Sequence, residues 1–264
     1  MWSTSAGNGV PVVLIHGGFS DYRYWELQQI AYAKHYRTIA VSLSGYYPDH
    51  SAIHDPLSAE QHIEEIGEFL KTLGQSAHLL GHSRGGRVAL HVAARYPDQV
   101  RSLVLAEPGG TLAPGFLPPI EKPAAGIAGA DIRHEVQLMI ARGEREDGLR
   151  RYLDSGHGVG AWDRAPEIFR RIAVANAGTI GGMNTDTGGA ISRDLAACIR
   201  APTLLIGGSN SPPLFAQVLN VLEGSIAKRQ RVTLSGADHF LNFTARTEFD
   251  GAVLKFFRDH SSAE

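Results

Sequence analysis

The sequence of 264 residues predicts an α/β fold, in which helices cover both faces of a mostly parallel sheet and a helical insertion interrupts the sheet. Three observations predict it. Short apolar runs alternate along the chain with segments of helical spacing. The runs are continuously apolar, as expected of strands that are buried on both faces. Between residues 109 and 200 this alternation stops, and no convincing buried strand occurs.

The first half of the chain supplies most of the sheet. Residues 58–61, Ser-Ala-Glu-Gln, match a capping box and predict the start of one helix. Its apolar side chains then follow helical spacing from Ile63 to Leu73. In order, we predict strand 11–15, helix 21–34, strand 38–43, the helix after 58, strand 77–80, helix 88–96 and strand 102–106.

The pattern divides the chain into a core, residues 1–110 and 200–264, and a helical cap or lid, residues 111–199. Within the cap we predict helices near 131–141 and 166–177 and a glycine-rich loop over 178–189. The sheet pattern then resumes. We predict strand 202–207, helix 215–222, strand 231–234 and a final amphipathic helix over 248–259.

Composition excludes several classes of protein. A net charge of −2 gives no electrostatic case for binding nucleic acid or an anionic membrane. The single cysteine, Cys198, rules out an intrachain disulfide and a thiolate zinc cluster, and its apolar neighbours predict a packed thiol. No apolar run is long enough for a membrane span and the first residues do not resemble a signal peptide, so we expect a cytoplasmic protein.

We expect no metal and no cofactor. His50 and His54 are spaced four apart, but flanking prolines favour a polar loop over a metal site. The glycines near Gly181 follow no strand, so they predict no dinucleotide or phosphate loop.

The stretch Gly81-His82-Ser83-Arg84-Gly85-Gly86 carries the strongest chemical signal. It lies between an apolar strand and a helix, which is the setting of a G-x-S-x-G nucleophile elbow. In that turn a strained backbone lifts the serine hydroxyl above the sheet. We therefore predict that Ser83 is a catalytic nucleophile; the alternative is a glycine-rich turn with an incidental serine.

A serine needs a base within hydrogen-bond reach and an acid that orients the base. His239 is the candidate base, because it lies on the loop after the last strand and before the final helix. Asp238 is its neighbour in sequence and is poorly placed to orient it. The alternative for His239 is an exposed loop histidine.

The acid has two candidate positions. The loop after strand 202–207 contains no carboxylate, only Asn210, which cannot stabilise a charged imidazolium fully. Glu107 directly follows strand 102–106 and is costly to leave unpaired there. We predict that Glu107 is the acid, in the chain order Ser, acid, His; an ion pair with an arginine is the alternative.

The turn His16-Gly17-Gly18-Phe19 ends the first predicted strand and supplies candidate donors for an oxyanion hole. We predict the backbone N–H of Gly18, with Phe19 as the alternative, together with that of Arg84. His16 is expected to shape the turn. The Arg84 side chain is predicted either to bind an acidic substrate group or to pair with an acid from the lid.

Some large side chains are candidates for a substrate pocket, with at least half of them expected in the core instead. They are Phe19, Tyr46, Tyr47, Trp162, Phe169 and Met183.

With the elbow, the glycine turn and the late histidine in this order, the chain resembles the α/β-hydrolase family over nearly its whole length. The resemblance implies an eight-stranded, mostly parallel sheet with a helical lid over the active site. It is similar to members whose acid follows the sixth strand instead of the seventh, which fits Glu107. Ser83 argues against the branches that use an aspartate nucleophile.

One feature departs from the family pattern. Members carry about two strands before the strand that ends in the glycine turn, whereas here only nine residues precede Val10. We expect the first strand, and on one reading the second too, to be missing or reduced, leaving an exposed sheet edge. An interface between copies, as in a homodimer, or a shortened N-terminus would each account for it.

These features predict a serine hydrolase with a Ser-His-Glu triad. We expect it to act, like a carboxylesterase, on an ester, lactone or related acyl bond of a small, partly hydrophobic substrate. A C–C bond hydrolase of the same fold is an alternative. A slow-turnover, receptor-like binding protein is another, because a fold alone does not decide function.

Overall fold

The computed structural model describes residues 1–49, 58–117, 128–186 and 189–261. Its strands form one sheet in the order β1-β3-β2-β4-β5-β6-β7. Strand β1 pairs with β3 antiparallel, and the other neighbours are parallel. The strands are β1 (Trp2–Ala6), β2 (Pro11–Ile15), β3 (Arg37–Ser42), β4 (Ala77–His82), β5 (Val100–Ala106), β6 (Thr203–Gly208) and β7 (Arg229–Leu234).

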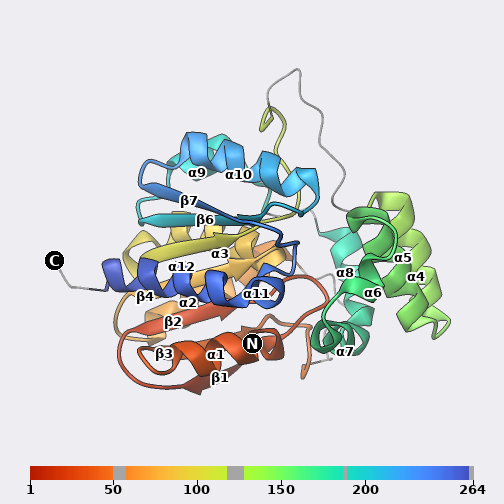
Figure 1. Cartoon of the computed structure of the whole chain (residues 1–264), viewed down its shortest axis with the longest axis horizontal. Coiled ribbons are helices and arrows are strands. Elements are labelled where there is room, and N and C mark those ends of the chain that lie inside the picture. Colours follow the sequence, from red (N-terminus) through yellow and green to blue (C-terminus); the bar gives the residue numbers. More distant parts are fainter. Residues whose placement is uncertain (50–57, 118–127, 187–188, 262–264) are drawn as a thin grey trace.

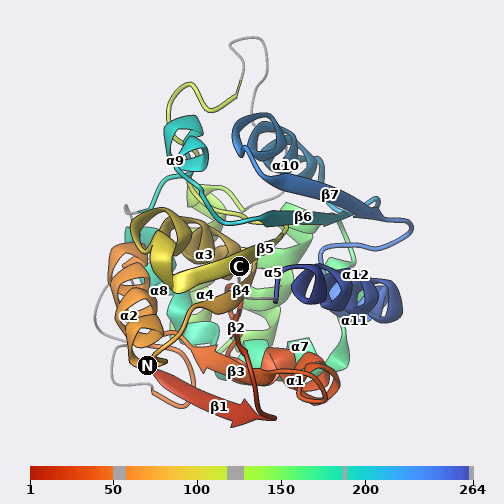
Figure 2. The same ribbon diagram turned by 90° about the vertical axis from the view of Figure 1, so that its left-hand side faces the viewer.

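Helices cover both faces of this sheet, because side chains alternate along its central strands. On β2, Val13 and Ile15 join one apolar cluster, whereas Val12 and Leu14 join another. The first cluster packs under α2, α3 and α10, and the second under α1 and α12. Figure 2 shows α2 and α3 on one side of the sheet and α1, α11 and α12 on the other. The predicted α/β class is therefore confirmed.

The helices of residues 130–185 gather beyond one end of the sheet, and Figure 1 shows α4 to α8 grouped there. The α-helices are α1 (Glu26–Tyr32), α2 (Ala59–Thr72), α3 (Arg84–Arg95), α4 (Ala130–Ala141), α5 (Arg145–His157), α6 (Ala161–Arg164), α7 (Glu167–Ala175), α8 (Ile180–Thr185), α9 (Arg193–Ala197), α10 (Pro213–Ser225), α11 (Leu241–Thr244) and α12 (Arg246–Asp259). Short 3₁₀ turns are η1 (Tyr22–Trp25), η3 (Pro97–Gln99) and η4 (Ala177–Thr179).

Helix α2 starts where the capping pattern places it. The Ser58 hydroxyl accepts the N–H groups of Glu60 and Gln61 at 3.1 and 3.4 Å. The prediction of a glycine-rich loop over 178–189 is wrong in part, because η4 and α8 form within that range. Helix α5 was not predicted at all.

The N-terminal expectation also needs correction. Residues Trp2–Ala6 form an antiparallel edge strand, so of the two strands expected to be reduced one is present. The described residues accordingly form seven strands where the resemblance implied eight. Trp2 is 54% exposed on this edge. None of the helices in the described part of the chain has the length and apolar content that a membrane span requires.

Candidate active site

Ser83 lies on the sharp turn between β4 and α3. Its backbone adopts φ 51° and ψ −118°, a conformation that costs free energy in a residue with a side chain. Glycines permit the turn: a Cβ on Gly81 would lie 2.3 Å from the carbonyl oxygen of Gly85, and one on Gly85 would lie 2.4 Å from that of His16. The sequence therefore forms an elbow that holds Ser83 at the edge of a cavity.

His239 and Glu107 meet beside this elbow. His239 Nδ1 and Glu107 Oε2 are 2.6 Å apart, and Glu107 Oε1 accepts the N–H of Gly208 at 2.7 Å. Glu107 itself has φ 45°, so its backbone is also in the left-handed region. The contact engages Nδ1 of His239 and leaves Nε2 as the ring nitrogen available for a proton from Ser83.

Asn210, the other candidate for the acid position, does not take this place. Its side-chain amide donates to the carbonyl oxygen of Gly236 at 3.1 Å and is exposed. Of the two candidates, the structure brings only Glu107 into contact with His239.

Burial shifts the pKa values of both His239 and Glu107. It lowers the pKa of His239 below the ordinary range, so the ring is neutral at pH 7 and able to accept a proton. Burial also raises the pKa of Glu107, although the hydrogen bond from Gly208 partly offsets the change. The His82 ring adds support, since its Nε2 donates to the His239 carbonyl oxygen at 2.9 Å.

The glycine turn after β2 lies against the elbow. A Cβ on Gly17 would be 3.2 Å from Cβ of Ser83, and both Gly18 and Phe19 line the same cavity as Ser83. His16 shapes the turn as expected: its Nδ1 donates to the Gly17 carbonyl oxygen at 2.8 Å, and its Nε2 accepts the N–H of Leu43 at 3.1 Å. Burial lowers the pKa of His16 to about 4, which keeps this ring neutral.

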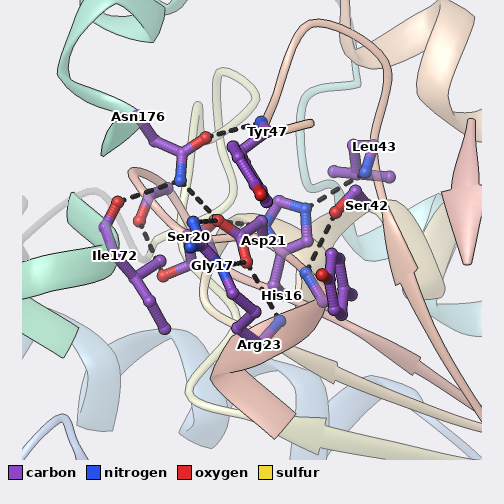
Figure 3. Close-up of polar contacts among 12 residues, drawn as sticks. His16, Gly17, Ser20, Asp21, Arg23, Ser42, Leu43, Tyr47, Ile172 and Asn176 are labelled. Atoms are coloured by element: carbon purple, nitrogen blue, oxygen red, sulfur yellow. Dashed lines mark hydrogen bonds and ion pairs between the residues drawn. The ribbon is translucent and has the colours of Figure 1, made fainter. Parts of the chain in front are cut away.

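A polar network joins the segment that follows this turn to the helical insertion (Figure 3). Asn176, which follows α7, donates to Asp21 Oδ2 at 2.7 Å and accepts the backbone N–H of Tyr47 at 2.8 Å. Asp21 also forms an ion pair with Arg23 at 2.6 Å. One side chain of the insertion thus joins two loops of the sheet.

The cavity above Ser83 has a volume of about 510 Å³. Of the candidate lining side chains, Phe19, Phe169 and Met183 line it. Tyr46 and Trp162 do not, which corrects the expectation for these two.

Both corrected side chains belong to the core instead. Tyr46 packs edge-on against His16, and the Trp162 indole N–H donates to Glu146 at 3.3 Å. Tyr47 lies in a separate surface pocket with Trp2 and Tyr22.

A family model described as alpha/beta hydrolase fold matches residues 10–245. The chain belongs to this family. It is 27% identical to the 2-(acetamidomethylene)succinate hydrolase of Mesorhizobium japonicum over 253 residues, which cover 89% of this chain and 84% of that protein. Over 120 residues, 43% of this chain, it is 32% identical to the 2-hydroxy-6-oxo-6-phenylhexa-2,4-dienoate hydrolase of Comamonas testosteroni.

Some curated relatives are matched over less than half of their own length. The share is 41% for the Comamonas hydrolase, and 30% for the dihydrolipoyllysine-residue acetyltransferase component of the acetoin cleaving system of Pseudomonas putida. Among solved structures, an esterase from Exiguobacterium antarcticum superposes with a TM-score of 0.79 at 21% identity, covering 97% of this chain and 95% of that one. This last likeness concerns the fold.

In this alpha/beta hydrolase the side chain of Arg84 pairs with an acid of the insertion, one of its two predicted roles. Asp186 Oδ2 accepts from Arg84 at 2.6 Å and from Arg87 at 2.5 Å. Burial alone would raise the pKa of Asp186, but the two guanidinium groups outweigh it and lower that pKa. The sequence does not single out Asp186, because the glycines around it predict only a loop.

His157 and Phe215 are cavity residues that the sequence did not reveal. His157 ends α5, and its ring centroid lies 5.0 Å from that of His239. Phe215, in α10, stacks on His239 with ring centroids 4.1 Å apart. Both belong to helices that the structure places over the site, and only their placement distinguishes them from ordinary core residues.

The remaining sequence candidates lie elsewhere. Cys198 is exposed, not packed, because it ends α9 while Ala196 and Ile199 take the buried positions. His50 and His54 lie outside the described residues. Within the described part of the chain, no three His, Cys, Asp or Glu side chains gather as a metal site would require.

Proposed function

We propose that this alpha/beta hydrolase is a serine hydrolase that cleaves an ester, lactone or related acyl bond, in the manner of a carboxylesterase. One observation carries the proposal: the 2.6 Å contact between His239 and Glu107 lies at the same cavity as the strained Ser83. A neutral imidazole that a carboxylate orients, at a cavity that a serine also lines, is the arrangement that can activate the serine.

In the proposed reaction, Ser83 Oγ attacks the acyl carbon while His239 Nε2 takes its proton. Glu107 holds the ring and stabilises the imidazolium that forms. The backbone N–H groups of Gly18 and Arg84 hold the developing oxyanion. His239 then protonates the leaving group, and water, deprotonated by His239, releases the acid from Ser83.

Labelling with a fluorophosphonate, followed by peptide mapping, tests this proposal. Wild type should be modified at Ser83 within the time that a reference esterase needs, and His239→Ala should lose labelling. His134→Ala is the matched control, because this histidine is exposed on α4, and it should label like wild type. Failure of the wild-type protein to react would refute the proposal.

A C–C bond hydrolase is the second candidate, favoured by the similarity to the Comamonas dienoate hydrolase. A receptor-like protein with slow turnover is the third. Steady-state kinetics separate the three. Turnover of a 4-nitrophenyl ester supports the first, loss of the dienoate absorbance without ester turnover supports the second, and a stoichiometric burst without turnover supports the third.

A further inference from the structure

A second histidine, His157, lines the cavity beside the candidate base. It ends α5 of the helical insertion, and its ring centroid lies 5.0 Å from that of His239 and 5.9 Å from that of Phe215. Because a hydrogen bond spans about 3 Å, a small molecule that is bonded to one imidazole can also reach the other. The reaction proposed above assigns no step to His157.

His157 differs from the buried histidines of the core in its hydrogen bonds. In those histidines at least one ring nitrogen is hydrogen-bonded; they are His16, His62, His78 and His82. No residue in the described part of the chain forms a hydrogen bond with the ring of His157. Burial lowers the pKa of this ring to about 3, so at pH 7 it is neutral, with one donor and one acceptor nitrogen. It can therefore bond to a polar molecule that enters the cavity.

The position of the hydrolytic water follows from the role of the base. His239 Nε2 gives its proton to the leaving group and then takes one from water, so the water occupies the place that the leaving group vacates. Phe215 and Phe240, whose rings contact His239, line the cavity there, and their side chains offer a water no strong hydrogen bond. A water held in one orientation needs at least two polar partners. The ring of His157 is placed to be the second.

We propose that His157 is a further catalytic residue, which binds the water that releases the acyl group from Ser83. This inference rests on the proposed function and assigns a residue to its second half. One hydrogen of the water bonds to His239 Nε2 and the other to the acceptor nitrogen of His157, so a lone pair faces the acyl carbon. The water oxygen bonds to that carbon as His239 takes its proton. The bond from the carbon to Ser83 Oγ then breaks, and the proton passes from His239 to Oγ.

Hydrolysis of 4-nitrophenyl acetate, followed from the first turnover, separates the two halves of the reaction. The initial burst of 4-nitrophenolate reports acylation of Ser83, and the loss of acetyl-Ser83, followed by intact mass spectrometry, reports its release. His157→Phe removes both ring nitrogens and keeps an apolar ring. We expect it to acylate within about twofold of the wild-type rate and to release acetate about 10- to 100-fold more slowly, so acetyl-Ser83 accumulates. His157→Leu should behave in the same way.

His157→Gln is the rescue variant, because its amide oxygen can accept the hydrogen bond from water, and it should recover most of the release rate. His134→Phe, at an exposed position on α4, is the matched control and should keep both wild-type rates. Equal losses of acylation and release in His157→Phe, no loss of either, or no recovery in His157→Gln would overturn the inference and leave the hydrolase intact. A wild type that neither turns over the ester nor reacts with a fluorophosphonate would instead refute the proposed function, and this inference with it.

Discussion

Mild acid should unfold this protein steeply, because its core holds several histidines in the neutral form. Burial lowers the pKa of His16 to about 4, and lowers that of His62, His78 and His82 to about 3. All four side chains are at most 3% exposed. In the unfolded chain they titrate near 6.5.

The free energy of unfolding should fall as the pH falls, because unfolding takes up protons in this pH range. Between pH 6.5 and about 4 the unfolded chain binds up to four more protons at these sites than the folded protein. Their contribution to stability is therefore complete above pH 6.5 and is lost as the pH falls. Burial raises the pKa of Glu107 and of Asp250, which offsets at most two of those protons. The remaining two or more lower the free energy of unfolding by about 3 kcal/mol per pH unit, against a total of roughly 5–15 kcal/mol.

Urea titrations at several pH values between 7.5 and 5.5, followed by tryptophan fluorescence, measure this slope. Trp25 and Trp162 are buried and report unfolding. His78→Asn should reduce the proton uptake by about one, whereas His134→Gln, at an exposed position, should leave it unchanged. An uptake below one proton in wild type, or equal slopes for these two variants, would refute the reasoning.

Two further predictions concern the site and its turn. Glu107→Gln should lower kcat on a chromogenic ester by about 10³- to 10⁴-fold, whereas Asn210→Ala should change it little; the reverse order would contradict the assignment of the acid. Gly81→Ala should destabilise the fold by about 3 kcal/mol or more, because its Cβ would meet the Gly85 carbonyl oxygen at 2.3 Å. Gly251 lies in α12 with open space around it, so Gly251→Ala should instead raise the free energy of unfolding by up to about 1 kcal/mol. Urea unfolding measures both variants. A similar loss of stability in both would show that the close contact at Gly81 does not matter.

The sequence was most informative about site residues whose positions follow from the backbone, at a tight turn or at the end of a buried strand. A G-x-S-x-G motif between a strand and a helix predicts the turn at Ser83, since few other backbones need glycines at both places. Glu107 was found because a carboxylate at the end of a buried strand requires a partner, and the structure brings His239 to it. The catalytic roles of these residues stay predictions until labelling tests them.

The sequence did not predict features that depend on tertiary contacts. Strand β1 is polar and largely exposed, so it lacks the apolar run that reveals buried strands. His157 and Asp186 become site residues only when the insertion folds over the sheet. Tyr46 and Trp162 looked like pocket residues because size and aromaticity do not distinguish a pocket from a core.

Phe19, Ser83 and Glu107 are the non-glycine residues with positive φ among those that the structure describes, and all three belong to the candidate site. Each such backbone costs about 1–3 kcal/mol, which glycine at the same position would largely avoid. A chain that drifted under selection for folding alone would replace them. Under the proposed function, glycine at Ser83 or Glu107 should therefore make the fold more stable while abolishing the reaction.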